Sequence, residues 1–310
     1  MLLDEAAARS PAFSEVLRLV RRVASAETSI LISGETGSGK DYIAELIHDA
    51  GPRRAGPFLK IDCASIPSSL AESEFFGYEK GAFSDAFQSK PGKLQLAHGG
   101  TVYLDGVHHL NPAVQSKLLR FVQEKTVEPL GGSRSIQVDC RVLASISVPL
   151  ETCLKERQLR EDLYYRLAGV VIAVPPLRER IQDIDLLLAS LLRELNEKYR
   201  KKTAFSQEAV NVLKHYHWPG NIRELRNVVE HAVIHSAGTV RPTDLPLGHS
   251  VLGREFLAHG AGESLSLEDL EKMYITEVLR RVDGHFGKAA EILKINRKTL
   301  LMKRRKYGIE

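Results

Sequence analysis

A glycine-rich stretch between two apolar segments carries the clearest chemistry of the sequence. It reads Gly34-Glu35-Thr36-Gly37-Ser38-Gly39-Lys40-Asp41 and satisfies the pattern GxxxxGK. Glycines let the backbone curl so that successive N–H groups point at phosphate oxygens, and Lys40 neutralises the charge of the β- and γ-phosphates. Because a strand-like run precedes the loop and a helix-like run follows it, the sequence predicts a nucleoside triphosphate site, with ATP as the expected ligand.

A second apolar run, residues 101–105, ends in Asp105. An acid at the end of such a strand holds magnesium beside the phosphates, so Asp105 is the expected Mg²⁺ ligand. Asp41 stands where a Ser or Thr usually touches this metal, and the ion would be held by Asp41 itself, by water or by Asp105. Most ATPases of this kind carry a glutamate after the acid, but this chain carries Gly106, which cannot orient the attacking water. The residues therefore predict ATP binding and leave hydrolysis open.

The composition of the 310-residue chain is typical of a globular protein with a sizeable core. Its length allows about two or three domains. No run of ~18 uncharged apolar residues occurs, and the start is not basic and then apolar, so neither a membrane span nor a secretory signal is expected. Cys63, Cys140 and Cys153 lack CxxC spacing and are expected as reduced thiols in the cytoplasm.

Positive charge is concentrated at the end of the chain, although the formal net charge of the whole is only +4. Residues 284–310 hold eight basic side chains against the acids Glu291 and Glu310, a net of about +6. The basic residues are Lys288, Lys294, Arg297, Lys298, Lys303, Arg304, Arg305 and Lys306. A solvated helix face could carry such charges, but a surface that faces phosphates explains their clustering better.

The first half of the chain alternates strand-like and helix-like runs, which predicts a three-layer α/β domain around a parallel sheet. Expected strands span residues 28–33, 58–62, 101–105 and 138–147. Expected helices span residues 40–49 and 112–124, the second with Val114, Leu118, Leu119 and Val122 at helical spacing.

The pattern changes after Pro175 and Pro176 to helices with little strand between them. Helices are expected at 183–199, 206–216 and 221–236, and then at 266–282, 287–293 and 296–306. Residues 244–264 are rich in Gly, Pro and His and read as a linker. The predicted domains are an α/β nucleotide-binding part (1–173), a helical lid (174–245), a linker (246–264) and a DNA-binding domain (265–310).

With these motifs in place, the chain resembles the bacterial enhancer-binding proteins, the AAA+ activators of sigma-54 RNA polymerase, from about Ser10 to Gly308. In this family an acid follows the loop lysine, so Asp41 is expected. Arg160-Glu161-Asp162-Leu163-Tyr164-Tyr165-Arg166-Leu167 resembles the segment that supplies arginine fingers, with Arg160 and Arg166 at the matching places. Trp218-Pro219-Gly220-Asn221-Ile222-Arg223-Glu224-Leu225 is similar to the sensor II segment, with Arg223 as the nucleotide-sensing arginine.

The resemblance implies a AAA+ P-loop domain that closes head-to-tail into rings, usually hexamers, with ATP and Mg²⁺ as cofactors. The lid would begin at the segment Pro175-Pro176-Leu177-Arg178-Glu179-Arg180. The segment that contacts the sigma factor would be Gly81, Ala82, Phe83, Ser84, Asp85 and Ala86. From the residues alone, the favoured interpretation of Arg160 and Arg166 is that of surface ion-pair partners of Glu161 and Asp162.

The end of the chain resembles a Fis-type helix-turn-helix, with its first helix at 289–293 and its recognition helix at 296–304. A recognition helix offers its N-terminal residues to base edges, so the predicted readers are Asn296, Arg297, Lys298 and Thr299. The predicted phosphate contacts are Lys303, Arg304, Arg305 and Lys306. The predicted core residues are Ile292, Leu293, Ile295 and Leu300. Residues 273–279 are expected to pair a dimer that matches an inverted repeat in double-stranded DNA.

Three departures from the family fall on its moving parts. Gly106 replaces the catalytic glutamate, and Asp85 places a charge in the sigma-contact loop where the family has glycine. Ile146 and Ser147 replace the sensor I ending that includes an amide. Asp62 stands where the family has an asparagine, and an acid there could orient water. His108 and His109 could also reach water or phosphate, although exposed histidines at a helix start are the simpler interpretation.

Two functions therefore stay open. One is a DNA-binding regulator whose ATPase remodels sigma-54 RNA polymerase. The alternative is a DNA-binding regulator that holds ATP without hydrolysing it and acts with a different sigma factor. A AAA+ chaperone or helicase loader is disfavoured by the helix-turn-helix. No receiver or ligand-sensing domain is recognised before the ATPase, so the protein is either naturally short or a fragment.

Overall fold

The computed structural model describes residues 8–236, 238–247, 266–282 and 285–308. It contains two compact units, Met1–Asp244 and Leu245–Glu310. The predicted linker falls mainly on residues 248–265, outside the described residues. No helix in the described part of the chain combines the length and the apolar character that crossing a membrane requires.

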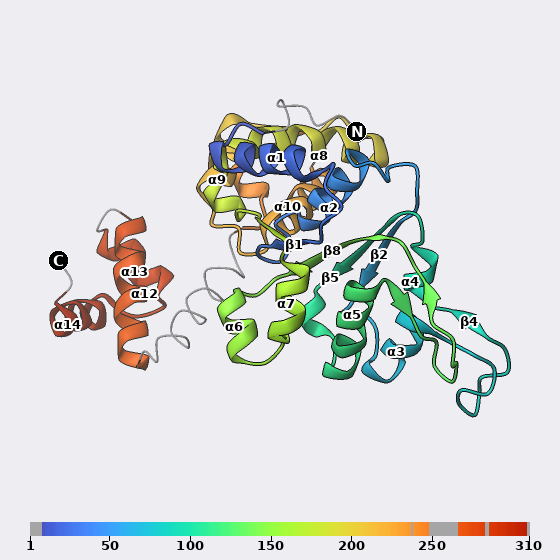
Figure 1. Cartoon of the computed structure of the whole chain (residues 1–310). Helices are drawn as coiled ribbons and strands as arrows, with labels where there is room; N and C mark the ends of the chain where they lie inside the picture. The colour runs from blue at the N-terminus through green and yellow to red at the C-terminus, as the bar shows by residue number, and fades with distance from the viewer. Residues whose placement is uncertain (1–7, 237, 248–265, 283–284, 309–310) are drawn as a thin grey trace. The chain divides into compact units, whose positions relative to one another are not determined.

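A five-stranded parallel sheet forms the centre of the first unit, in the order β2-β5-β8-β1-β9. The strands are β1 (Ile30–Ser33), β2 (Phe58–Asp62), β5 (Thr101–Asp105), β8 (Arg141–Ile146) and β9 (Val170–Ala173). The three-layer α/β prediction is confirmed (Figure 1). β1 and β8 are shorter than predicted, and the edge strand β9 was not predicted because its four residues give too short an apolar run.

Alternating side chains of the sheet enter two separate cores. Leu31 faces the core formed with α3 (Ser68–Phe76), α5 (Pro112–Glu124) and α7 (Glu161–Leu167). Ile30 and Ile32 face the opposite core, formed with α1 (Pro11–Val23) and α2 (Lys40–Asp49). α4 (Lys93–Leu96) and α6 (Leu150–Lys155) add Leu94 and Cys153 to the first core. The period-2 alternation of the strands thus fixes which helices cover each face.

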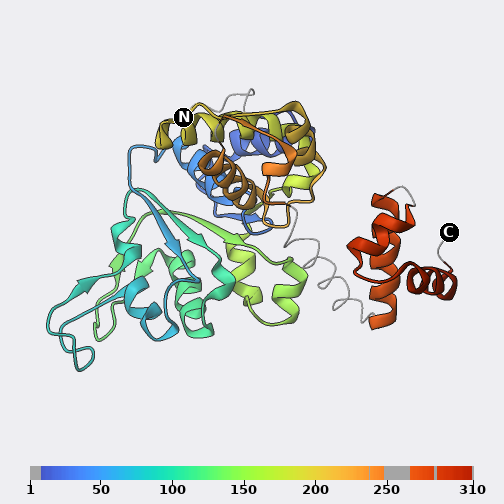
Figure 2. The same cartoon turned by 180° about the vertical axis from the view of Figure 1, so that it is seen from behind.

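Short strands extend the first unit on the side of α3, where Figures 1 and 2 show a loop reaching away from the sheet. β3 (Gly77–Tyr78) pairs with β4 (Lys90–Pro91), and β6 (Thr126–Val127) pairs with β7 (Ile136–Gln137). A bridge between Tyr78 and Leu130 joins the two pairs. The predicted sigma-contact loop, residues 81–86, lies between β3 and β4.

The lid segment of the first unit is helical, with α8 (Ile184–Tyr199), α9 (Gln207–His215) and α10 (Asn221–His235). Two 3-10 turns precede α8, η3 (Leu177–Glu179) and η4 (Ile181–Asp183), and a third, η5 (Pro242–Asp244), ends the segment. A two-residue ladder joins β10 (Ala204–Phe205), between α8 and α9, to β11 (Thr239–Val240), after α10. Trp218 is fully buried and donates to the Leu213 carbonyl over 2.8 Å.

The second unit packs α12 (Leu267–Arg281), α13 (Phe286–Ile292) and α14 (Arg297–Tyr307) around a small core. Its buried residues are Ile275, Val278, Leu279, Ala289, Ala290 and Leu300. The core role predicted for Ile292 is wrong, because this side chain is 52% exposed at the end of α13. Leu293 and Ile295 pack partly buried against the core as expected. Ile275, Val278 and Leu279 are already covered by their own chain, and pairing through 273–279 stays a prediction.

Candidate functional site

One cavity of 460 Å³ collects most of the residues predicted to handle nucleotide. The predicted residues that line it are Thr36, Gly37, Gly39, Lys40, Asp41, Asp62, Asp105 and Arg223. They come from the glycine loop, the carboxyl ends of β2 and β5, and the start of α10. Gly34, Glu35 and Ser38 of the loop do not line the cavity. Ser147 and Arg226 line it without having been predicted to bind nucleotide, and His109, for which contact with water or phosphate was the less favoured interpretation, lines it too.

The glycine loop is held in a conformation that needs its glycines. Gly37 has φ +76°, and a Cβ there would lie 2.5 Å from the Gly220 carbonyl oxygen of the lid. Gly39 has φ +101° and caps α2. The ammonium of Lys40 donates to the Gly34 and Glu35 carbonyls over 2.7 and 3.0 Å. Burial lowers the pKa of Lys40, while Asp105 and Asp41 act in the opposite direction.

The lid grips the glycine loop through three side chains that the sequence prediction missed. Arg178 forms two hydrogen bonds with Glu35, and these hold the pKa of the Glu35 carboxyl below its usual value. Asn221 donates to Glu35 Oε2 and to the Thr36 carbonyl, both over 3.1 Å. Arg180 donates to the Ser38 carbonyl. The loop therefore has its carbonyl side fixed by the lid while its other side faces the cavity.

Arg180 is 2% exposed and lies over the Phe13 ring of α1, 4.5 Å from its centroid. Burial lowers its pKa to about 10, and the nearby Asp183 acts in the opposite direction. Asp183 in turn accepts hydrogen bonds from the backbone of Arg9 and Ser10 and from the Ser10 hydroxyl. The start of α1, the lid and the glycine loop therefore share one buried polar connection.

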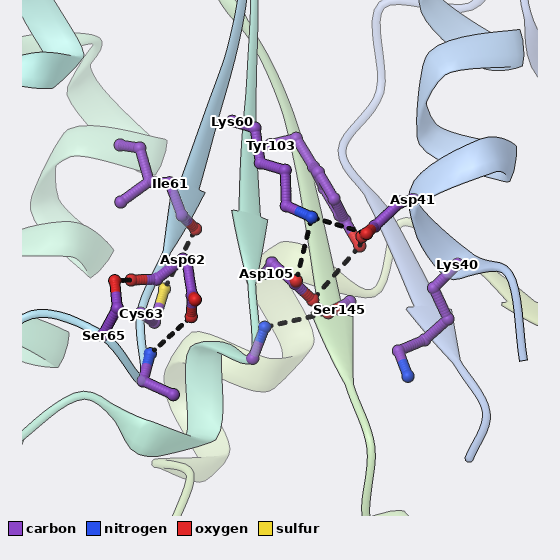
Figure 3. A network of polar contacts seen from close by, with 12 residues as sticks. Lys40, Asp41, Lys60, Ile61, Asp62, Cys63, Ser65, Tyr103, Asp105 and Ser145 are labelled. Atoms are coloured by element: carbon purple, nitrogen blue, oxygen red, sulfur yellow. Dashed lines mark hydrogen bonds and ion pairs between the residues drawn. The ribbon is translucent and has the colours of Figure 1, made fainter. Parts of the chain in front are cut away.

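A cluster of polar side chains joins Asp41 to Asp105 (Figure 3). The Lys60 ammonium lies 2.5 Å from Asp41 Oδ2 and 3.3 Å from Asp105 Oδ2. The Tyr103 hydroxyl lies 3.1 Å from Asp41 Oδ1 and 3.3 Å from Asp105 Oδ1, and Ser145 donates to Asp105 Oδ1 over 2.7 Å. Burial alone would raise the pKa of Asp105, but the Ser145 hydrogen bond and the Lys60 charge lower it. The ionised form of Asp105 is therefore favoured, and the Lys60 ammonium faces the carboxylates of both acids.

Gly106 turns the chain sharply after β5, with φ +74° and ψ +49°. Its N–H donates to the Ser145 hydroxyl over 2.9 Å, so Ser145 holds both the acid and the turn that follows it. A Cβ at Gly106 would lie 2.8 Å from Cδ2 of His109. The missing glutamate is thus accompanied by a left-handed backbone that an L side chain rarely adopts.

The two histidines after Gly106 differ from each other. His109 is exposed, as expected, but His108 is only 6% exposed and the expectation of an exposed side chain is wrong for it. The 3-10 turn η2 (Val107–His109) folds His108 back toward β8, where its Nε2 lies 3.3 Å from the Ser147 hydroxyl. Burial lowers the pKa of His108 to about 4, with the charges of His109 and Lys40 adding to this shift.

Of three positions at which the sequence departs from the family, Asp62 and Ser147 line the cavity and Ile146 does not. Asp62 lines it, and its Oδ1 accepts from the Ala64 N–H over 3.0 Å. Ser147 lines it as well and presents a hydroxyl. Ile146 is fully buried in the core at the end of β8, so it cannot contact a ligand in the cavity.

The predicted sigma-contact loop lies outside the cavity. Gly81 N–H donates to the Ala86 carbonyl over 2.9 Å and closes the loop, whose Ala82, Ser84 and Asp85 lie between these ends. Phe83 is 43% exposed and its ring packs edge-on against Tyr78 at 4.9 Å. Phe87, which was not singled out, is 75% exposed. The loop therefore presents two aromatic rings.

Neither predicted arginine finger lines the cavity of its own chain. Arg160 pairs with Asp162 through contacts of 3.0 and 2.8 Å and donates to the Ser116 hydroxyl over 3.0 Å. This matches the ion-pair alternative that the residues left open. The Arg166 side chain is exposed and makes no hydrogen bond or ion pair with the residues that the structure describes.

The predicted DNA-binding residues divide into capping, packed and exposed groups. Asn296 caps α14, accepting from the N–H and hydroxyl of Thr299 over 2.7 and 2.9 Å. Lys303 lies 2.5 Å from Glu271 of α12, and Arg304 lies over the Phe286 ring at 5.1 Å. The exposed group is Arg297, Lys298, Arg305 and Lys306, of which Lys306 pairs with Glu268 at 2.6 Å.

Comparison with known families agrees with this geometry along nearly the whole chain. The Sigma-54 interaction domain matches residues 6–173, the AAA+ ATPase lid domain matches 178–251, and the Fis family of bacterial regulatory proteins matches 266–307. The chain belongs to the sigma-54-dependent AAA+ activators.

This activator is 39% identical to the regulatory protein AtoC of Escherichia coli, over 97% of its own length and 67% of AtoC. It is 41% identical to the alginate biosynthesis transcriptional regulatory protein AlgB of Pseudomonas aeruginosa, over 99% of its own length and 68% of AlgB. The structures of NtrX from Brucella abortus in complex with ADP and with ATP each match with a TM-score of 0.71 and 31% identity, covering 97% of this chain and 69% of NtrX. The chain thus spans about two thirds of these relatives.

These findings identify the protein as a sigma-54-dependent activator with a AAA+ nucleotide-binding domain, a lid and a Fis-type helix-turn-helix. They do not favour the alternative of a regulator that acts with a different sigma factor. The sequence prediction of the activator missed Lys60, Ser145 and the lid side chains around the glycine loop. Side chains alternate between the two faces of a strand, so Lys60 lies on the same face of β2 as Asp62. This pattern could have indicated that Lys60 lies near the site.

Proposed function

We propose that this activator binds ATP with Mg²⁺ in the 460 Å³ cavity. The observation that carries the proposal is the convergence of Lys40, Asp41, Asp105 and Arg223 on that cavity, next to a glycine loop in the required conformation. The NtrX complexes with ADP and with ATP support it. The test is the dissociation constant of a fluorescent ATP analogue, which should rise at least tenfold in Lys40→Ala. An unchanged constant in that variant would remove the cavity as the site.

Asp41 and Asp105 would hold the magnesium ion, because carboxylates are the oxygen donors that Mg²⁺ prefers. Their orientation fits such an ion, since both already converge on one cationic group, the Lys60 ammonium. A bound divalent ion would neutralise charge on the phosphates. The protein side contributes the fixed carboxylates, which Tyr103 and Ser145 orient.

We propose that hydrolysis at this site is slow and depends on Asp62. No carboxylate follows Asp105, and loss of a water-orienting group costs orders of magnitude because positioning is most of phosphoryl-transfer catalysis. Asp62 is the carboxylate that lines the cavity at the end of the neighbouring strand, in register with Asp105. Phosphate release should fall at least tenfold in Asp62→Asn and stay unchanged in Glu45→Gln, a matched change on α2. Equal rates in all three proteins would exclude Asp62.

The output of nucleotide binding is proposed to pass through the loop that carries Phe83 and through a second copy of the chain. The Arg166 side chain is exposed and does not line the cavity of its own chain, which suits contact with the nucleotide of a neighbour in a ring. Ring formation should therefore increase with ATP, measured by light scattering, and Arg166→Ala should lower phosphate release while ATP affinity in the isolated chain stays the same. A release rate that is independent of protein concentration would contradict this assignment.

The second unit is proposed to bind an inverted repeat in double-stranded DNA through α14. Arg297 and Lys298 are the best candidates for base contacts, because both are exposed at the start of that helix. Asn296 and Thr299 have part of their hydrogen-bonding capacity committed to the helix cap. Selection of bound sequences from a random duplex library tests this assignment, and a selected set without a two-fold repeat would overturn it.

A further inference from the structure

Lys60 is a charged residue that contacts two of the residues lining the nucleotide site, and none of the motifs includes it. Its ammonium bridges Asp41 Oδ2 and Asp105 Oδ2, at 2.5 and 3.3 Å, and so joins a residue of the glycine loop to the acid at the end of β5 (Figure 3). These are the two carboxylates that would hold magnesium. The Lys60 ammonium thus occupies the position between the two carboxylates that a divalent ion would also need.

The sheet builds this position. Phe58, Lys60 and Asp62 share one face of β2, and Tyr103 and Asp105 share the same face of β5 next to it. Lys60 pairs in register with Tyr103, and its ammonium lies 5.8 Å from the centroid of that ring. The Phe58 ring stacks on the Tyr103 ring with 6.3 Å between the centroids, so Tyr103 is packed against a second aromatic side chain.

The two acids need a cation even without metal. They lie close together, because an oxygen of each lies within hydrogen-bond distance of the same Tyr103 hydroxyl, Asp41 Oδ1 at 3.1 Å and Asp105 Oδ1 at 3.3 Å. Like charges at such a separation repel each other, and they also repel a phosphate that enters the cavity. Lys40 does not bridge them here, because its ammonium donates to the Gly34 and Glu35 carbonyls. Lys60 is the cation that lies within ion-pair distance of both acids in the described part of the chain.

We propose that Lys60 is a tethered counter-cation of Asp41 and Asp105, which permits nucleotide to bind without metal and competes with Mg²⁺ for the two carboxylates. The exchange is feasible because the side chains of Lys60, Asp41 and Asp105 are 37%, 46% and 28% exposed, and ion pairs with that access to water are weak. The inference rests on the proposed nucleotide site. It makes Lys60 a positioning residue that sets how strongly nucleotide binding depends on magnesium.

The test is the affinity for ADP, measured by calorimetry with the whole chain in EDTA and then at increasing Mg²⁺ concentration. The variants are Lys60→Met, which keeps the length of the side chain and removes its charge, and Lys60→Arg, which keeps the charge. Lys90→Met is the matched control, because Lys90 forms a comparable ion pair at 2.7 Å with Glu74, an acid that does not line the cavity. Thermal unfolding of each variant shows whether it is folded.

In EDTA, Lys60→Met should bind ADP about tenfold more weakly than the wild type, the effect of ~1.4 kcal/mol. Mg²⁺ should increase the affinity for ADP, and the Mg²⁺ concentration that gives half of this increase should be severalfold lower in the same variant. The reason is that the carboxylates no longer have a competing ammonium. At saturating Mg²⁺ the two proteins should bind alike, and Lys60→Arg and Lys90→Met should follow the wild type.

Equal affinities in EDTA together with equal magnesium dependence in Lys60→Met and the wild type would overturn the inference and leave the proposed site intact. If Lys60→Met is unfolded, the comparison of Lys60→Arg with Lys60→Gln decides, because only the second lacks the charge. Absence of ADP binding by the wild type at saturating Mg²⁺ would instead overturn the proposed function.

Discussion

The guanidinium of Arg178 in the lid forms two hydrogen bonds, of 2.9 and 2.6 Å, with the carboxylate of Glu35 in the glycine loop. Both side chains are about two-fifths exposed, so this ion pair alone contributes little. Its neighbour Asn221 is fully buried and links the same carboxylate to the Thr36 carbonyl and to the Leu177 N–H. Of these two contacts between the lid and the loop, the buried amide should therefore contribute more than the exposed ion pair.

Asn221→Ala should lower stability by about 1–3 kcal/mol, because it leaves buried polar partners unsatisfied. The residue also has φ +54°, a conformation that Asn tolerates better than Ala. Arg178→Ala should cost less than about 1 kcal/mol. The measurement is urea unfolding followed by the fluorescence of Trp218, the single tryptophan of the chain.

Asn221→Gly separates the two causes, since glycine removes the hydrogen bonds and accepts a positive φ. The stability of Asn221→Gly should lie between that of the wild type and that of Asn221→Ala. If Arg178→Ala destabilises the protein as much as Asn221→Ala does, the exposed ion pair and not the buried amide couples lid and loop.

A glutamate in place of Gly106, directly after Asp105, should make the protein less stable. Gly106 has φ +74°, and any Cβ there meets His109 at 2.8 Å, so Gly106→Glu and Gly106→Ala should each lower stability by about 1–2 kcal/mol. Gly106→Asn should cost less, because Asn adopts left-handed conformations more readily. Urea unfolding checks the order of the three variants, and an undiminished stability of Gly106→Ala would show that the turn relaxes freely.

His108 should make the first unit less stable in acid. Its pKa is lowered to about 4 by burial and neighbouring charge, below the ~6.5 of an unfolded histidine. The unfolded chain therefore takes up a proton between these values, and stability is complete above pH ~6.5 and falls as the pH drops toward 4. The contribution is at most about 3 kcal/mol.

The check is the difference in unfolding free energy between pH 7.5 and pH 5, which should shrink in His108→Gln. His217→Gln is the control, because His217 is exposed. His48 is also buried, and burial lowers its pKa, so part of the acid sensitivity should survive in both variants. An undiminished difference in His108→Gln would mean that its proton uptake is not linked to unfolding.

The sequence predicted those parts of the site that local pattern encodes. The spans of β2, β5, α2 and α5 agree with the prediction, because apolar runs bounded by Gly, Pro or polar residues define them. The lid contacts were out of reach, since Arg178 and Asn221 meet the loop across 143 and 186 residues of chain. The burial of His108 was missed for a related reason: a 3-10 turn of three residues leaves no periodicity to read.

Alanine substitutions of the basic residues of α14 should have different effects, on DNA binding for Arg305 and on stability for Lys303. Arg305 is exposed, whereas Lys303 pairs with Glu271, which also accepts from the Tyr307 hydroxyl over 2.5 Å. If Arg305 contacts a DNA phosphate, Arg305→Ala should reduce the slope of log K against log salt by about 0.9, the effect of one neutralised phosphate. Lys303→Ala should leave the slope unchanged and instead destabilise the packing of α12 against α14. The measurement is the salt dependence of binding to sonicated duplex DNA, with circular dichroism melting of each variant as the folding control. A slope that falls in Lys303→Ala and not in Arg305→Ala would reverse the assignment and place the phosphate-facing side of α14 on the turn that carries Lys303.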